Sequence, residues 1–323
     1  MAIKLKGTGR ALPDRVVTNE ELATLVDTSD EWIRERTGIG SRHVSTGETV
    51  ADLAVAAAKK ALEDAGATGD EVELILVASC SSEMALPCVA CQVQSAIGAH
   101  KAVAFDLNAA CSGFLFAMHT ADAYMASGIY HNALVIGAEV LSKIVNWEDR
   151  GTCILFGDGA GAAYFAKDPE SQTPLPYVQR SDGTKGQVLA CGQHAHKNAF
   201  YEGEDNLQYV TMDGREVFRF ATRQVPEAIL ELLGKTALEP DDIDCYVLHQ
   251  ANRRIIESIA KRLQVDIAKF PSNVERVGNT SSASIPILLD ELRKEGRIKP
   301  GMKVVLSGFG AGLTYGACLL ELS

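Results

Sequence analysis

The chain has 323 residues, of which 46% are hydrophobic and 23% are charged, an ordinary balance for a globular protein with a large core. Its net charge of −11 argues against binding nucleic acid or an anionic membrane through bulk charge. No apolar run is long enough to span a bilayer, the N-terminus lacks a signal-peptide pattern, and the eight cysteines are scattered. We therefore expect a reduced, cytoplasmic protein.

Strand-like and helix-like runs alternate in the first half of the chain. We predict strands over 74–78, 102–107, 133–136 and 162–165, and helices over 88–97 and 112–127. The helix over 112–127 has one charged residue, Asp122, and is apolar nearly all round. Such a helix belongs in the interior of a large protein.

The second half repeats this order. It predicts a strand over 245–248, a helix over 252–263, a short extended piece near Phe270, a helix over 281–294, and strands over 304–306 and 317–320. The glycine run at 156–162 also resembles the one at 308–314. Alternating units of this kind predict a layered α/β fold with mainly parallel central strands.

A polar stretch with prolines, 167–176, separates the two halves. We predict an N-terminal half over 1–168 and a C-terminal half over 169–323. A second polar stretch, 192–213, reads as an extended loop or flap on the second half.

Cys111 stands where the strand over 102–107 runs into the apolar helix. A helix N-terminus carries partial positive charge, so a thiol there is expected to shift toward the reactive thiolate. The alternative is that Cys111 is one of the many buried cysteines that act only as small hydrophobes.

Two further residues follow strands or precede helices in the second half. His249 comes directly after the strand over 245–248, and Asn279 comes just before the helix over 281–294. Ligands in α/β folds gather at such points, so the two residues would meet Cys111 if the halves pack about a pseudo-twofold axis. Taken singly, His249 also suits a structural histidine and Asn279 a turn or cap residue.

These three residues lie in motifs that resemble those of β-ketoacyl-acyl-carrier-protein synthase III, the initiating condensing enzyme of type II fatty acid synthesis in the thiolase superfamily. The motifs are AACSGF at 109–114, HQANRR at 249–254 and GNTSSA at 278–283. The resemblance covers essentially the whole chain, with further matching segments at 26–32, 36–39, 149–152, 156–161 and 308–316. It implies a thiolase-like fold of two pseudo-duplicated βα halves in a layered α-β-α-β-α arrangement.

The resemblance also implies a reaction. Cys111 would attack an acyl-CoA thioester and become acylated, with the oxyanion held by the backbone N–H groups of Cys111 and Ala311. Malonyl-acyl-carrier-protein would then lose carbon dioxide, and its enolate would attack the acyl group. His249 and Asn279 would donate hydrogen bonds to the malonyl thioester oxygen, His249 as a neutral group. Acyl-CoA is a substrate here, and no cofactor is expected.

Seven positions would contact CoA by the same resemblance. Trp32 would stack on the adenine, with Arg150 on the other face of the base, and the remaining contacts would come from Thr28, Arg36, Gly214, Phe218 and Asn252. Without the resemblance, Trp32 and Phe218 also suit core aromatics, and the arginines suit ordinary surface charges.

An acidic carrier protein needs a local basic patch on this acidic chain. The helix over 252–263 offers Arg253, Arg254, Lys261 and Arg262, and Arg215 and Arg219 extend the patch. The alternative is a solvated helix face with Arg253, Glu257 and Lys261 paired at i,i+4 spacing.

The family gates its acyl pocket across a homodimer interface with a residue from the loop before Pro87. Leu86 stands there, without an aromatic nearby, so the length of the primer stays open. The pair Cys88 and Cys91 reads as buried helix thiols, and His194 and His196 in the polar stretch are weak evidence for a metal, so no metal site is predicted.

Other functions fit less well. A thiolase would have a second reactive cysteine near the C-terminal glycine loop, whereas Cys318 falls in a strand. A cysteine hydrolase has no use for Asn279, and a non-enzymatic scaffold would not need all three chemical groups. A synthase III-like enzyme of secondary metabolism, with another acyl donor or acceptor, remains the alternative.

Overall fold

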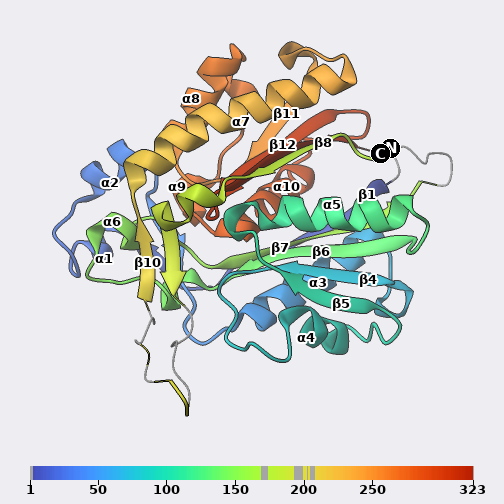
Figure 1. Ribbon diagram of the computed structural model, residues 1–323, viewed down its shortest axis with the longest axis horizontal. Helices are drawn as coiled ribbons and strands as arrows, with labels where there is room; N and C mark the ends of the chain where they lie inside the picture. The colour runs from blue at the N-terminus through green and yellow to red at the C-terminus, as the bar shows by residue number, and fades with distance from the viewer. Residues whose placement is uncertain (1–2, 169–173, 193–198, 202, 204–207, 323) are drawn as a thin grey trace.

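The computed structural model describes residues 3–168, 174–192, 199–201, 203 and 208–322. Helical layers and sheets alternate in Figure 1: outer helices, a sheet, central helices, a second sheet and further outer helices. The fold predicted from the sequence, two βα halves in a layered α-β-α-β-α arrangement, is therefore confirmed. The boundary between the halves near residue 168 stays a prediction.

The first half contributes a five-stranded sheet. Its strands follow the order β1 (Ile3–Ala11), β7 (Gly159–Lys167), β6 (Asn132–Glu139), β4 (Leu74–Ala78) and β5 (Val103–Leu107). The ladders β4–β5 and β4–β6 are parallel, whereas β6–β7 and β1–β7 are antiparallel. The strand β5 forms one edge of this sheet.

The second half contributes a four-stranded sheet in the order β11 (Cys245–Leu248), β12 (Lys303–Gly310), β13 (Thr314–Glu321) and β8 (Tyr177–Ser181). Only the β11–β12 ladder is parallel in this sheet. The expectation of mainly parallel strands is therefore wrong. The reason is that β7 returns beside β6 after the segment 140–158, which carries α6 but no crossover to the far side of the sheet, and that β13 returns beside β12 through the short turn 311–313.

Three pairs of helices make the helical layers. The outer layer on the first sheet has α3 (Val50–Ala65) and α4 (Val89–Ala96), and the outer layer on the second sheet has α7 (Gly214–Thr236) and α8 (Arg253–Leu263). Between the sheets lie α5 (Gly113–Ala126) and α10 (Ser284–Lys294). The near-uniform apolarity of α5 follows from this place, because both of its sides face a sheet.

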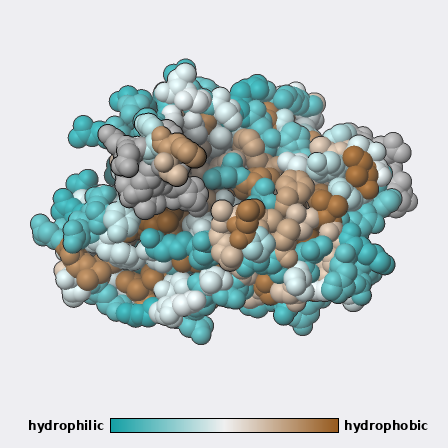
Figure 2. All heavy atoms as spheres, turned by 60° about the horizontal axis from the view of Figure 1, so that its bottom comes forward, coloured by the Kyte–Doolittle hydropathy of each residue, from teal (hydrophilic) through white to brown (hydrophobic). Residues whose placement is uncertain are grey.

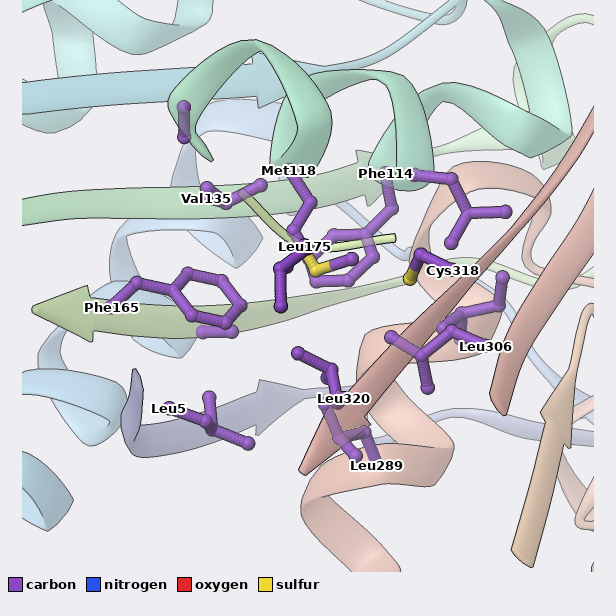
Figure 3. Close-up of a cluster of buried hydrophobic side chains, with 14 of the residues drawn as sticks. Leu5, Phe114, Met118, Val135, Phe165, Leu175, Leu289, Leu306, Cys318 and Leu320 are labelled. Atoms are coloured by element: carbon purple, nitrogen blue, oxygen red, sulfur yellow. The ribbon is translucent and has the colours of Figure 1, made fainter. Parts of the chain in front are cut away.

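The core between the sheets joins residues from both halves. In Figure 3, Phe114 and Met118 of α5 and Leu289 of α10 point into a cluster with Leu5 and Leu306. The cluster continues through Val135, Phe165, Leu175, Cys318 and Leu320, all at most 3% exposed. Cys318 is thus a core residue of β13, as expected for a chain that is not a thiolase.

Shorter elements surround the central layers. They are α1 (Asn19–Leu22), α2 (Asp30–Thr37), α6 (Arg150–Cys153), α9 (Val274–Val277) and two small sheets, β2 (Val16–Thr18) with β3 (Ser41–His43), and β9 (Leu189–Gly192) with β10 (Gln208–Met212). The polar stretch 192–213 is therefore not only loop, since its described ends pair as a hairpin. The pair His194 and His196 lies outside the described residues.

Three local predictions need correction. The piece near Phe270 is a 3₁₀ turn, Ile267–Lys269, rather than an extended segment. Cys88 and Cys91 are half-buried and exposed, not buried, because they lie at the start and on the outer side of α4. The strands β1 and β8 are absent from the prediction, because Lys4 and Lys6 in β1 and Gln179 and Arg180 in β8 interrupt the apolar pattern.

Candidate active site

Cys111 lies in a 3₁₀ turn, Ala110–Ser112, between β5 and α5. Ala110 has a φ of +46°, and Asn108 Oδ1 accepts its N–H at 3.1 Å, which turns the chain sharply after the strand. Ser112 Oγ lies 2.7 Å from Thr314 Oγ1 of β13, so the turn is tied to the second half. The turn therefore places the Cys111 thiol at the N-terminus of a buried helix, where Cys111 is 8% exposed.

Burial raises the pKa of the Cys111 thiol to about 12, while the Ser281 hydroxyl lowers it and the Glu139 charge raises it. The expected shift toward thiolate is therefore wrong for the substrate-free molecule. Loss of solvation outweighs the helix N-terminus at a site this deep. Attack by Cys111 must then include loss of its proton.

His249 follows β11 and is 3% exposed. Its Nδ1 lies 2.6 Å from Ser284 Oγ, and that oxygen also accepts the N–H of Gln250 at 3.3 Å. When the Ser284 hydroxyl donates to Nδ1, the ring carries its hydrogen on Nε2. Burial lowers the pKa of His249 to about 3, so the ring is a neutral donor at neutral pH.

Asn279 is fixed on both its backbone and its side chain. Its N–H donates to Leu155 O at 2.9 Å, and its carbonyl accepts from Gly157 N at 3.0 Å. Its side-chain Oδ1 accepts the N–H of Ser281 at 2.9 Å. Within an amide group only the oxygen accepts hydrogen bonds, so Oδ1 is the atom that faces Ser281. The amide nitrogen Nδ2 then remains available as a donor.

Cys111, His249 and Asn279 line one cavity of about 730 Å³. The three residues come from the ends of β5 and β11 and from the turn before α10, which the two-sheet packing brings together. Phe309 packs edge-on against the His249 ring, with 5.3 Å between ring centroids. The cavity continues past Phe218 and Asn252 to Arg36, Gly214 and Arg254.

The end of β12 lies directly against the Cys111 turn. A Cβ on Gly310 would stand 2.6 Å from Cys111 N and 3.0 Å from Ser112 N, so only glycine permits this approach. Ala311, the next residue, lines a second cavity of about 720 Å³ together with Cys111. The two backbone segments expected to hold an oxyanion are thus adjacent.

The second cavity reaches Cys111 from a different side than the cavity that contains His249 and Asn279. Its apolar walls include Leu141, Ile144 and Phe156, and the hairpin β9–β10 contributes Leu189 and Val210. Cys111 therefore stands where two cavities meet.

Two arginine side chains lie against the Trp32 ring, Arg36 from the same helix, α2, and Arg150 from α6. The guanidinium carbons of Arg36 and Arg150 each lie 4.7 Å from its ring centroid, and Arg150 also donates to Asp27 O at 2.8 Å. Thr28 Oγ1 is buried and has no hydrogen-bond partner in the described part of the chain. Thr28, Trp32 and Arg150 do not line the Cys111 cavity; Arg36 links them to it.

The basic residues of α8 differ in their partners. Arg253 pairs with Glu257 and Glu275, and Arg262 Nη2 lies 3.6 Å from Glu227. Arg254 and Lys261 are exposed and form no ion pair among the described residues. Asn252 caps α8 by accepting from Arg254 N at 2.8 Å, and its Nδ2 donates to Arg36 O at 3.0 Å.

Leu86 is 82% exposed and does not line the Cys111 cavities of its own chain. Figure 2 shows other apolar residues exposed among polar ones on the face where the layer of α3 and α4 comes forward. Within the described residues, no cluster of potential metal ligands occurs, and no helix combines the length and apolarity that crossing a membrane demands.

Sequence reasoning missed the residues that support the three side chains. Ser284, which contacts His249, falls within the first turn of the predicted helix over 281–294, and Glu139 falls just beyond the predicted strand over 133–136. No local pattern marks either one, because their partners lie far away in the sequence.

A buried thiol, a neutral imidazole and an oriented amide around one cavity, in a thiolase-like fold, define an acyltransferase that works through a cysteine. The family model described as 3-oxoacyl-[acyl-carrier-protein] synthase III matches residues 105–183, and the model of its C-terminal part matches residues 233–322. The chain belongs to this family of condensing enzymes.

The β-ketoacyl-[acyl-carrier-protein] synthase III of Clostridium novyi is 48% identical over 99% of this chain and 98% of its own length. The crystal structure of the Aquifex aeolicus 3-oxoacyl-[acyl-carrier-protein] synthase III matches with a TM-score of 0.92 and 42% identity, covering 99% of both chains. The priming β-ketosynthase of the R1128 polyketide pathway matches at 0.91 and 35%, over 99% of this chain and 96% of its own.

Proposed function

We propose that this chain loads a short acyl group, such as acetyl, from acyl-CoA onto Cys111 and condenses it with malonyl-acyl-carrier-protein. The product would be a 3-oxoacyl-acyl-carrier-protein, the first intermediate of type II fatty acid synthesis. The observation that carries the proposal is the single cavity lined by Cys111, His249 and Asn279.

In the first step, Cys111 Sγ attacks the thioester carbonyl, and the thiol proton leaves with CoA as its free thiol. The N–H groups of Cys111 and Ala311 would hold the developing oxyanion; the close approach of Gly310 to the Cys111 turn supports this assignment. The high pKa of the thiol implies that proton loss accompanies attack rather than preceding it.

In the second step, the malonyl thioester loses carbon dioxide, and negative charge builds on its carbonyl oxygen. His249 Nε2–H and Asn279 Nδ2–H would donate to that oxygen. The enolate carbon then attacks the acyl carbonyl, the bond between that carbon and Cys111 Sγ breaks, and the leaving thiolate takes up a proton from solvent to regenerate the thiol. Both donors are neutral, so neither needs to change its protonation state.

The CoA nucleotide would lie beyond the cavity mouth. We propose contacts with Thr28, Trp32, Arg36 and Arg150, and with Gly214, Phe218 and Asn252 along the tunnel. The unpartnered Thr28 hydroxyl supports a ligand there. Because two guanidinium groups already lie against Trp32, an adenine can stack on this ring only after one of them moves.

The carrier protein would dock on α8. Arg254 lies at the cavity, with its guanidinium carbon 5.9 Å from the Phe218 ring centroid, and Lys261 lies on the same helix. Neither forms an ion pair in the described part of the chain. We propose that these two residues contribute more than Arg253 and Arg262, whose charges are already neutralised in part by glutamates.

We further propose a homodimer in the cytoplasm, with no cofactor. The exposed side chain of Leu86 and the 46% exposed Val103 on the edge strand β5 support a covered face in solution. In a dimer, Leu86 would gate the acyl pocket of the partner subunit. Light scattering on the purified protein tests this, and a monomer at all concentrations would contradict it.

A panel of acyl-CoA primers with malonyl-acyl-carrier-protein tests the proposed reaction. Mass spectrometry should detect acylated Cys111 and a 3-oxoacyl-carrier product with a short primer. Turnover only with another acceptor or an unrelated donor would instead favour an enzyme of secondary metabolism.

A further inference from the structure

Glu139 ends β6 as a fully buried carboxyl group that the reaction above does not use. Its Oε1 accepts from Ser282 Oγ at 2.8 Å and from Ser281 Oγ at 3.1 Å. Its Oε2 accepts from Ser81 Oγ at 2.5 Å and from Cys80 N at 3.1 Å. One carboxyl group therefore joins the end of β4, in the first half, to the turn before α10, in the second half.

This turn, Ser281–Ala283, lies unusually close to β6. A Cβ on Gly137 would stand 2.2 Å from Ser282 O, so a side chain at this position would push the turn away. Ser281 itself has a φ of +50°, which is costly for a residue with a side chain. Such strain persists only where surrounding contacts hold the backbone, and the Ser281 hydroxyl is held by Glu139.

The same Ser281 orients the carboxamide of Asn279. Its N–H donates to Asn279 Oδ1 at 2.9 Å, and this bond determines which end of the amide is available as a donor. Asn279 in turn lines the cavity with Cys111 and His249. A chain of two hydrogen bonds thus runs from Glu139 through Ser281 to Asn279.

We propose that Glu139 is a positioning residue for malonyl decarboxylation, which holds Ser281 so that Asn279 presents Nδ2 to the thioester oxygen. This inference rests on the proposed function. Acyl loading uses Cys111 and the backbone N–H groups of Cys111 and Ala311 instead, so it should depend far less on Glu139. The two half-reactions therefore separate this role from a general role in stability.

The test uses full-length Glu139→Gln and Ser281→Ala enzymes and the double variant. Loading is followed by mass spectrometry with acetyl-CoA, and decarboxylation by release of labelled carbon dioxide from malonyl-acyl-carrier-protein on enzyme already acylated. Each single variant should lose about tenfold or more in decarboxylation, since small misplacement of a catalytic group has large effects. Loading should not fall in Glu139→Gln, which removes a charge beside Cys111, and should fall far less than decarboxylation in Ser281→Ala. The double variant should lose no more decarboxylation than the worse single one.

Ser79→Ala is the matched control. Ser79 Oγ contacts the opposite oxygen, Oε2, at 3.3 Å and forms no bond with the 281–283 turn, so its removal should leave decarboxylation nearly unchanged. Equal losses in both half-reactions, or additive losses in the double variant, would overturn the proposal. If Glu139→Gln fails to fold, normal decarboxylation in Ser281→Ala would still overturn it. Wild-type enzyme that neither loads nor decarboxylates would refute the proposed function itself.

Discussion

At Cys111, burial and charge act in the same direction. Loss of solvation is the larger cause, and together with the nearby Glu139 charge it raises the thiol pKa to about 12, against the lowering effect of the Ser281 hydroxyl. The half-buried Cys80 thiol also faces Glu139. Cys111 is therefore a thiol, not a thiolate, in the free enzyme at neutral pH.

This predicts how alkylation of Cys111 depends on pH. The rate of inactivation by iodoacetamide should rise with pH beyond 9 without a plateau near neutrality, because only the thiolate reacts. Glu139→Gln should move the curve to lower pH by removing a negative charge, and Ser281→Ala should move it to higher pH. A plateau below pH 8 in the wild-type enzyme would contradict the assigned protonation state.

For His249 we expect the opposite behaviour, a rate of decarboxylation that does not change with pH. Burial lowers its pKa to about 3, so the ring is neutral throughout the range in which an exposed histidine titrates. Decarboxylation by acylated enzyme should keep its rate as pH rises through about 6.5. A rate that falls with a midpoint near that value would mean that the imidazolium is the active form.

The chemistry of the single residues could be predicted, whereas their environment could not. The identities of Cys111, His249 and Asn279 follow from strand ends and motifs in the sequence. The sign of the Cys111 pKa shift depends on how deeply α5 is buried. The contacts with Ser284, Ser281 and Glu139 depend on packing between distant segments, which no local pattern contains.

Among the helices, α8 combines a core face and a charged face. Ile255, Ile256, Ile259 and Leu263 are at most 6% exposed, while the basic residues point outward. The pairing of Arg253 with Glu257 agrees with the alternative of a solvated face. That alternative does not account for Arg254 and Lys261, which pair with no carboxylate among the described residues.

Charge reversal on α8 tests carrier-protein docking. Arg254→Glu and Lys261→Glu should each raise the KM for malonyl-acyl-carrier-protein by about tenfold and leave acyl-CoA loading nearly intact. Arg297→Glu, which reverses a charge paired with Glu295 outside this helix, is the control and should change neither. Equal damage to both half-reactions would argue against docking on α8.

At the scale of helices and strands, the sequence predicted where strands occur better than it predicted which strands pair and in which direction. The strands β4 and β11 appear with the predicted bounds, because their residues are buried and apolar throughout. The edges β1 and β8 were missed, and the antiparallel ladders were not foreseen, because strand direction depends on how the chain returns between sheets.

On the scale of the whole molecule, the core between the two sheets holds the site together. It contains α5, which carries Cys111 at its start, and α10, which follows Asn279. Its apolar residues come from both halves of the chain (Figure 3). The repeated pattern in the sequence predicted a layered α/β fold, and the resemblance to the synthase III family implied this particular order of layers.

Shortening a large side chain in this core should greatly reduce the stability of the protein. Phe114→Ala should lower the free energy of unfolding by about 3–5 kcal/mol, because Phe114 is 0% exposed and leaves a cavity. Urea denaturation followed by circular dichroism measures it. Ile129→Ala, at a position 57% exposed, should cost within about 0.5 kcal/mol. Similar losses in both variants would place the core elsewhere.

Intact-protein mass spectrometry after incubation with acetyl-CoA tests the site most directly. The wild-type chain should gain one acetyl group, and Cys111→Ala should gain none. His249→Ala and Asn279→Ala should still be acetylated but should release carbon dioxide from malonyl-acyl-carrier-protein at least about a hundredfold more slowly. An acetyl group retained by Cys111→Ala, or unchanged decarboxylation in both other variants, would contradict the role of these three residues.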